Sequence, residues 1–89
     1  MSALERPDMA LLVRQRLTEN AGDLDALFAL AAIQARSGRL SEGLTILDHV
    51  LRLDPRYPGA WRFKATLHRM NGQTDAERSA RERAEDAEP

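Results

Sequence analysis

Residues 24–57 read LDALFALAAIQARSGRLSEGLTILDHVLRLDPRY, and residues 58–89 read PGAWRFKATLHRMNGQTDAERSARERAEDAEP. Several residues of the first stretch return in the second at a constant offset of 34 positions. These pairs are Gly38 with Gly72, Pro55 with Pro89, Ala26 with Ala60, and Ala31 with Ala65. Glycine, proline and alanine are favoured at a position for different structural reasons, so an offset that all three share indicates a duplicated structural unit.

Each copy of the unit has the sequence pattern of two helices. Apolar residues recur at helical spacing, and no stretch shows the strict alternation of apolar and polar residues that predicts a strand. Glycine and proline interrupt the pattern at short intervals. Connections of about three to five residues make consecutive helices antiparallel neighbours. We therefore predict an all-α fold, an antiparallel helix-pair solenoid of about five helices.

Local signals predict where the first two helices begin and end. The first covers about residues 8–19, with Pro7 tolerated in its first turn. Gly22 is expected to take the left-handed conformation after this helix, and Asp23 to cap the next one. The second helix then runs from about Leu24 to Ser37.

The third and fourth helices are predicted from a serine and two prolines. Ser41 can cap the third helix, which ends before Pro55 because proline disfavours helical geometry in the preceding residue. Pro58 suits the first turn of the fourth helix, which continues to Asn71 and Gly72.

The fifth helix differs from the others in composition. Thr74 and Glu77 form a capping-box signature at its start. Its apolar stripe contains alanines alone, at positions Ala76, Ala80, Ala84 and Ala87. Most of its other residues are Arg, Glu or Asp, which is the pattern of a terminal capping helix of a solenoid.

The two copies resemble tetratricopeptide repeats. The family places a Trp or Leu in the first turn of the first helix, filled here by Leu27 and Trp61, and the run from Val50 to Pro55 is similar to its closing signature. The chain departs from the family pattern at Gly43, where the family usually has Ala, and at Arg81, which replaces the usual aromatic residue. The resemblance divides a single domain into three parts: a leading helix or half-repeat (1–23), repeat 1 (24–57), and repeat 2 with the charged capping helix (58–89).

The resemblance implies a concave surface, lined by the first helix of each pair, that receives a peptide or helix of a partner protein. The peptide-binding candidates are Phe28, Ala32, Ala35, Arg36, Arg62, Thr66, Arg69 and Met70. Arg14 and Asn20 are expected near its edge. Phe28 would be the exposed aromatic, and the arginines would suit an acidic peptide or a C-terminal carboxylate. Phe28 and Ala32 stand where chaperone-binding relatives carry Lys and Asn, so that carboxylate clamp is not expected.

Other conspicuous residues favour structural roles. Trp61 is expected to pack between helices. His49 and His68 lack a ligand cluster, so no metal site is predicted. Asp48 and His49, with Ser37 or Ser41 nearby, have the residue types of a catalytic triad without its turn context. We therefore expect neither an enzyme nor a cofactor.

Composition narrows the classes of partner and location. The 89 residues include no cysteine and carry a net charge of −1. No segment has the one-sided basic charge of a nucleic-acid or membrane binder, so neither is expected as a partner. The first residues lack the apolar stretch of a secretory signal. We expect a bacterial, cytoplasmic protein.

Three hypotheses of function remain open. The first is a protein–protein interaction module, acting as an adaptor, scaffold or small co-chaperone. The second is structural self-association, in which Leu4, Met9 and Leu11 of the leading helix pair with a second copy to form a homodimer. In the third, the chain is the repeat portion of a larger enzyme or assembly factor.

Overall fold

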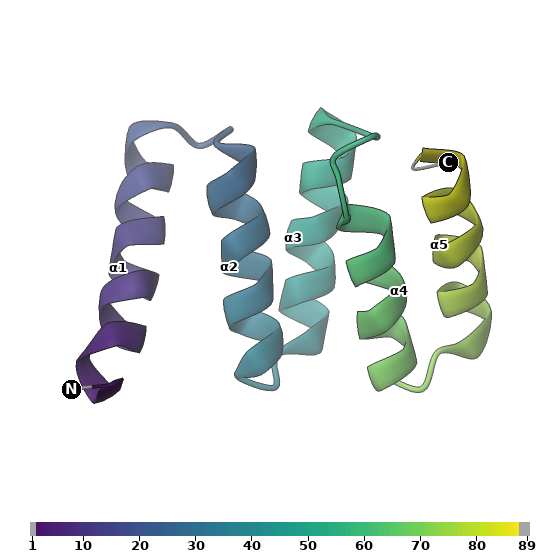
Figure 1. The fold of residues 1–89 in the computed structure, drawn as a ribbon, viewed down its shortest axis with the longest axis horizontal. Coiled ribbons are helices and arrows are strands. Elements are labelled where there is room, and N and C mark those ends of the chain that lie inside the picture. Colours follow the sequence, from purple (N-terminus) through teal and green to yellow (C-terminus); the bar gives the residue numbers. More distant parts are fainter. Residues whose placement is uncertain (1, 88–89) are drawn as a thin grey trace.

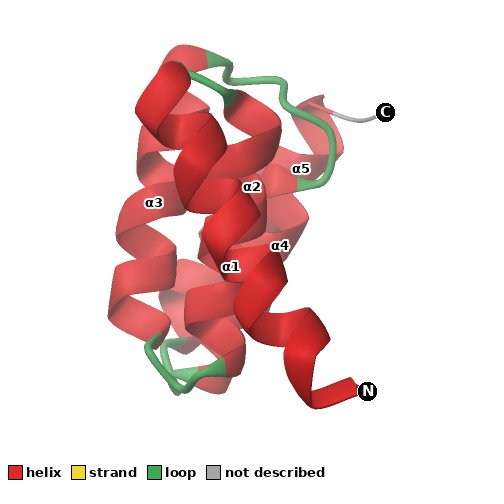
Figure 2. Cartoon of the chain, turned by 90° about the vertical axis from the view of Figure 1, so that its left-hand side faces the viewer, coloured by secondary structure: helices red, strands yellow, loops and turns green. Residues whose placement is uncertain are grey.

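The computed structural model describes residues 2–87, and side chains from Met9 to Ala87. Within this range the chain forms five helices and no strand, as predicted. The helices are α1 (Ser2–Glu19), α2 (Leu24–Arg36), α3 (Leu40–Leu53), α4 (Ala60–Met70) and α5 (Thr74–Ala87). They lie side by side in sequence order with alternating direction (Figure 1). Figure 2 shows α1 at the near end of this array, with its N-terminal end directed away from α3.

The repeated glycines close the two helix pairs in the same way. Gly38 and Gly72 have φ angles of 83° and 73°, in the left-handed region that favours glycine. After α2, Arg39 N–H donates to the Gln34 carbonyl at 2.9 Å, and Gly38 N–H donates to the Ala35 carbonyl at 3.0 Å. The same two hydrogen bonds recur at Gly72 and the residue after it, with distances of 3.0 and 2.8 Å. Both turns are Schellman motifs, so the 34-residue offset repeats backbone geometry as well as sequence.

Two of the expected helix starts, those of α4 and α3, need correction. Pro58 lies before α4, because Tyr57, Pro58, Gly59 and Ala60 form a turn closed by a 3.2 Å bond from Ala60 N–H to the Tyr57 carbonyl. Gly59 has φ 82° and ψ −9°, which are the angles of the third residue in a type II turn. Ser41 does not cap α3, whose N-cap is Arg39 without a side-chain hydrogen bond.

The first helix and the connection after it also differ from expectation. The helix α1 begins at Ser2, so Pro7 does not lie in its first turn. The residues before Pro7 include Ala, Leu, Glu and Arg, which favour helix. Gly22 is not left-handed; its N–H donates to Asn20 Oδ1 at 3.0 Å, and this side-chain turn closes the connection. Asp23 caps α2 as predicted, accepting from Ala26 N–H at 3.0 Å.

The core lies between α2, α3 and α4 in two clusters. The buried residues of the first cluster are Leu27, Val50, Leu51 and Ala60, and those of the second are Ala31, Ala35, Leu47 and Leu67. Phe28 packs against both clusters. Where Gly43 of α3 faces α2, a Cβ atom on it would lie 3.2 Å from both the Ala31 carbonyl oxygen and Leu67 Cδ1. Glycine at this position therefore lets the two helices come close.

Candidate functional site

The predicted binding residues divide between two helices of the array. Phe28, Ala32, Ala35 and Arg36 lie on α2, and Arg62, Thr66, Arg69 and Met70 lie on α4. Arg36, Arg62, Arg69 and Met70 are exposed, while Ala32 and Thr66 are half-buried. The structure brings only part of this set together in one hollow.

Phe28 is not the exposed aromatic that we expected. Its ring is half-buried, with its centroid 5.4 Å from that of Tyr57 and 5.5 Å from that of Phe63. These tilted ring pairs join α2 to α4 and to the segment before it, and they use the aromatic side chain for packing. Ala35 is buried in the second core cluster. In the α2 part of the predicted surface, Phe28 and Ala35 therefore contribute to packing, while Arg36 is exposed.

The α4 part of the prediction lines a groove on the last helix pair. Arg62, Thr66 and Arg69 meet α5 across a hollow of about 250 Å³. We call this hollow the terminal groove; its full lining is Arg62, Ala65, Thr66, Arg69, Glu77, Arg81, Ala84 and Glu85. Ala65 and Ala84 are buried, so the polar side chains surround a small apolar floor.

The terminal groove carries charges of both signs. Three arginines and two glutamates line it. Arg81 forms an ion pair with Glu77 one helical turn away. Arg69 is exposed and reaches the groove from the end of α4. A partner with an apolar stripe and flanking carboxylates would match both the floor and the guanidinium groups.

The same positions of the first repeat are covered by α4. The groove positions Arg69, Glu77, Arg81 and Glu85 correspond, 34 residues earlier, to Ala35, Gly43, Leu47 and Leu51. Those four residues are buried where α2, α3 and α4 meet. The terminal groove is therefore the position at which a further helix would pack on the last pair.

The α5 side of this groove was missing from the sequence-based set. Glu77, Arg81 and Glu85 lie one helical turn apart and face α4 across the groove. The residues 34 positions earlier are Gly43, Leu47 and Leu51, so the offset between the two repeats could have identified these three positions from the sequence. The expected edge residues lie elsewhere. Arg14 is exposed on α1, and Asn20 uses its side chain in the turn after α1.

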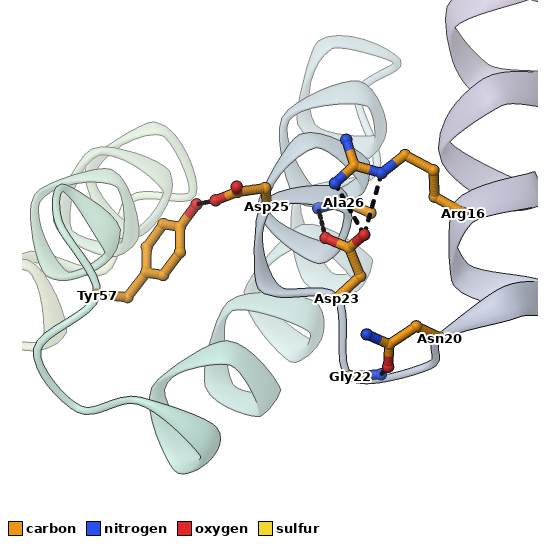
Figure 3. Close-up of polar contacts among 7 residues, drawn as sticks. All are labelled: Arg16, Asn20, Gly22, Asp23, Asp25, Ala26 and Tyr57. Atoms are coloured by element: carbon orange, nitrogen blue, oxygen red, sulfur yellow. Dashed lines mark hydrogen bonds and ion pairs between the residues drawn. The ribbon is translucent and has the colours of Figure 1, made fainter.

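Polar contacts tie the beginning of α2 to its neighbours (Figure 3). Asp23 pairs with Arg16 of α1 at 2.8 Å, and the Tyr57 hydroxyl donates to Asp25. The hydrogen bond from the Ala26 N–H, together with Arg16, holds the pKa of Asp23 below its ordinary value. Burial, followed by the hydrogen bond to Asp25 and nearby carboxylates, raises the pKa of Tyr57 to about 12. These contacts fix α1 and the segment before α4 to the beginning of α2.

Trp61, Asp48 and His68, which the sequence analysis considered for other roles, each contact neighbouring residues in the structure. Trp61 packs on the first core cluster, so the expected packing role is confirmed. Asp48 pairs with Lys64 at 2.7 Å, and His68 Nδ1 lies 2.7 Å from Gln73 Oε1. Among the described side chains, no three His, Cys, Asp or Glu residues gather in a group that could hold a metal ion. No helix within residues 2–87 has the length and apolar character needed to cross a membrane.

Comparison with known proteins matches residues 24–67 to the tetratricopeptide repeat family. The matched segment spans α2, α3 and most of α4, which are the elements that share the core. Comparison with curated proteins and comparison with solved structures gave no match.

Proposed function

Because the chain belongs to the tetratricopeptide-repeat family, whose repeats generally mediate protein–protein interactions, we propose that it binds a helix of another protein in the terminal groove. The main support for this proposal is that α4 fills the equivalent groove of the first repeat. There α4 buries Ala60 and Leu67 and packs Phe63 against the core. A partner helix on α4 and α5 would place small apolar residues over Ala65 and Ala84.

The proposed contact extends beyond the groove along the faces of α4 and α2. Met70 is 57% exposed at the end of α4 and offers an adaptable apolar contact. We propose that the half-buried Ala32 and the exposed Arg36 of α2 add to this contact. Acidic residues beside the apolar stripe of the partner would pair with Arg62 and Arg69. In this proposal the protein acts as an adaptor or scaffold.

The test is site-specific cross-linking in a lysate of the native organism. A photoreactive amino acid at Thr66 should capture a discrete partner, while the same amino acid at exposed Thr45 of α3 should not. Adding the Arg69→Glu substitution should reduce capture at Thr66 strongly, because the charge facing the partner is reversed. Arg39→Glu, at an exposed position outside the groove, is the matched control. Equal capture from Thr66 and Thr45 would reject the groove as the binding site.

Self-association through α1 is a second candidate function, favoured by exposed apolar residues. Met9, Leu11 and Leu12 are 51%, 54% and 58% exposed. The side chain of Leu4, which we also expected in this contact, lies outside the described side chains. An apolar patch on the first helix could pair with its copy across a two-fold axis. Sedimentation should then show a dimer that Leu12→Glu dissociates; a monomer at all concentrations would exclude this function.

A further inference from the structure

A tryptophan is fixed at the junction of α3, α4 and α5. Trp61 packs against the first core cluster, and its indole Nε1–H donates to the Pro55 carbonyl at 3.0 Å. The side chain is nevertheless only half-buried. A rigid aromatic ring with an exposed part is a common centre of a protein-binding surface.

Two hollows adjoin this ring on the molecular surface. One, of about 420 Å³, is lined on its polar side by Asp48, Arg52, Lys64 and Arg83. The other, of about 280 Å³, is lined by Arg56, Arg83, Asp86 and apolar neighbours. Trp61, Pro55 and Arg83 line both hollows, so the two form one continuous area. We call it the Trp61 surface; it shares no lining residue with the terminal groove.

Positive charge exceeds negative charge on the Trp61 surface. Lys64 lies 5.0 Å and Arg83 5.4 Å from the centroid of the Trp61 ring, within cation–π range. Lys64 is neutralised by Asp48 at 2.7 Å. Among residues 9–87, no carboxylate forms an ion pair with Arg52, Arg56 or Arg83. Three guanidinium groups around one tryptophan therefore retain their capacity to bind carboxylates.

We propose that the Trp61 surface docks an acidic peptide segment of a partner protein. Carboxylates of the segment pair with Arg52 in one hollow, with Arg56 in the other, and with Arg83, which lines both. The cations over the ring favour this occupant over a single-stranded nucleic acid, because a stacked base would have to displace them from the indole. This site is separate from the terminal groove and does not depend on the function proposed for it.

The surface contains its own reporter, because Trp61 is the only tryptophan of the chain. We would titrate the full chain with a synthetic decaglutamate peptide at low ionic strength. The readouts are the tryptophan fluorescence and the indole N–H resonance in NMR spectra. A saturable change that weakens with added salt is expected, since exposed ion pairs are screened. The Arg52→Glu/Arg83→Glu variant should bind the peptide about tenfold or more weakly.

A double charge reversal at two exposed positions serves as the matched control. In about 0.1 M salt, where the Debye length is about 10 Å, Arg14→Glu/Arg39→Glu should keep the affinity within about twofold of the parent chain, since neither residue lines the Trp61 surface. Far-UV circular dichroism checks that each variant is folded, and Arg52→Gln/Arg83→Gln provides a milder replacement. No change with decaglutamate, or equal affinity in the doubly substituted chain, would overturn the proposal. Tighter binding of a ten-nucleotide oligothymidine would also overturn it and assign the surface to nucleic acid.

Discussion

At the scale of single residues, Asp23 links helix capping to the contact between α1 and α2. One oxygen accepts the Ala26 N–H and the other pairs with Arg16 (Figure 3). Both contacts are stronger with the ionised carboxylate than with the neutral carboxyl group, and together they lower the pKa of Asp23. The stability that they contribute is therefore present above the ordinary pKa of 3.8 and is lost as the pH falls through the lower pKa of the folded state.

This linkage predicts an acid-dependent difference between the parent chain and Asp23→Asn. Asparagine can still cap a helix, but it carries no charge. Thermal unfolding should show that acidification below pH 3.8 lowers the Tm of the parent more steeply than that of the variant. The same pH dependence in both proteins would contradict the role assigned to the carboxylate.

Tyr57 gives the opposite dependence, at alkaline pH. Its pKa is raised from 10.0 to about 12, so the neutral hydroxyl is favoured in the folded state. This contribution to stability is complete below pH 10 and is lost as the pH rises from 10 toward 12. Because Tyr57 is the only tyrosine, phenolate absorbance reports its titration directly. Asp25→Asn should move the midpoint toward 10, since it removes a neighbouring negative charge; an unchanged midpoint would argue against that contact.

At the scale of helices, packing between elements holds the array together more than the helices stabilise themselves. Single helices of 11–18 residues are marginal in water. The core clusters remove this limitation by placing α4 against α2 and α3. Leu47 and Leu67 have no exposed surface and meet in the second cluster. Their contact joins the second helix of one repeat to the first helix of the next.

Shortening a leucine at this contact should test the importance of packing between repeats. Leu47→Ala is expected to lower the free energy of unfolding by about 2–5 kcal/mol, because it leaves a cavity. Leu53→Ala, the same substitution at a position that is 51% exposed, should change it by about 0.5 kcal/mol or less. Urea denaturation measures both. Similar losses in the two variants would mean that the second cluster is not a major source of stability.

The helix boundaries show which helix ends can be predicted from glycine and proline alone. Gly38, Gly72 and Pro55 predicted three helix ends correctly, because glycine permits the left-handed conformation that follows a helix and proline disfavours helical geometry in the residue before it. Pro58 was assigned to the wrong side of a boundary. Proline suits both the first turn of a helix and the second residue of a type II turn, and here Gly59 supplies the left-handed residue that selects the turn.

At the scale of the whole molecule, the two helix pairs differ in the residues that they present to a following helix. The first helix pair presents small and apolar residues to α4. The second pair presents Glu77, Arg81 and Glu85 in the terminal groove at the corresponding positions. Charge at these positions disfavours stacking of a further apolar helix, as in the capping units of solenoids. Binding there requires a partner that also satisfies the charges.

Apolar residues at these groove positions should therefore allow a second copy of the chain to pack on α4 and α5. We expect Glu77→Ala/Arg81→Leu/Glu85→Leu to self-associate with rising concentration, because its groove would resemble the one that α4 fills. The matched control is Asp75→Ala/Arg78→Leu/Glu82→Leu, which makes the same kinds of replacement at exposed positions of α5 outside the groove. Sedimentation velocity compares both with the parent chain. Association of the control to the same extent would show that general hydrophobicity, and not the groove, is responsible.

The sequence by itself determined the all-α class, the repeat period and most of the turns. Glycine and proline act through the backbone angles of one or two residues, so their effects can be read without knowing which helices touch. Tertiary structure decided which side chains remain available for binding. Phe28 is half-buried against the core because Tyr57 and Phe63 lie against it. The terminal groove and the Trp61 surface likewise form where residues of different helices meet, and their exposure depends on which helix covers each face.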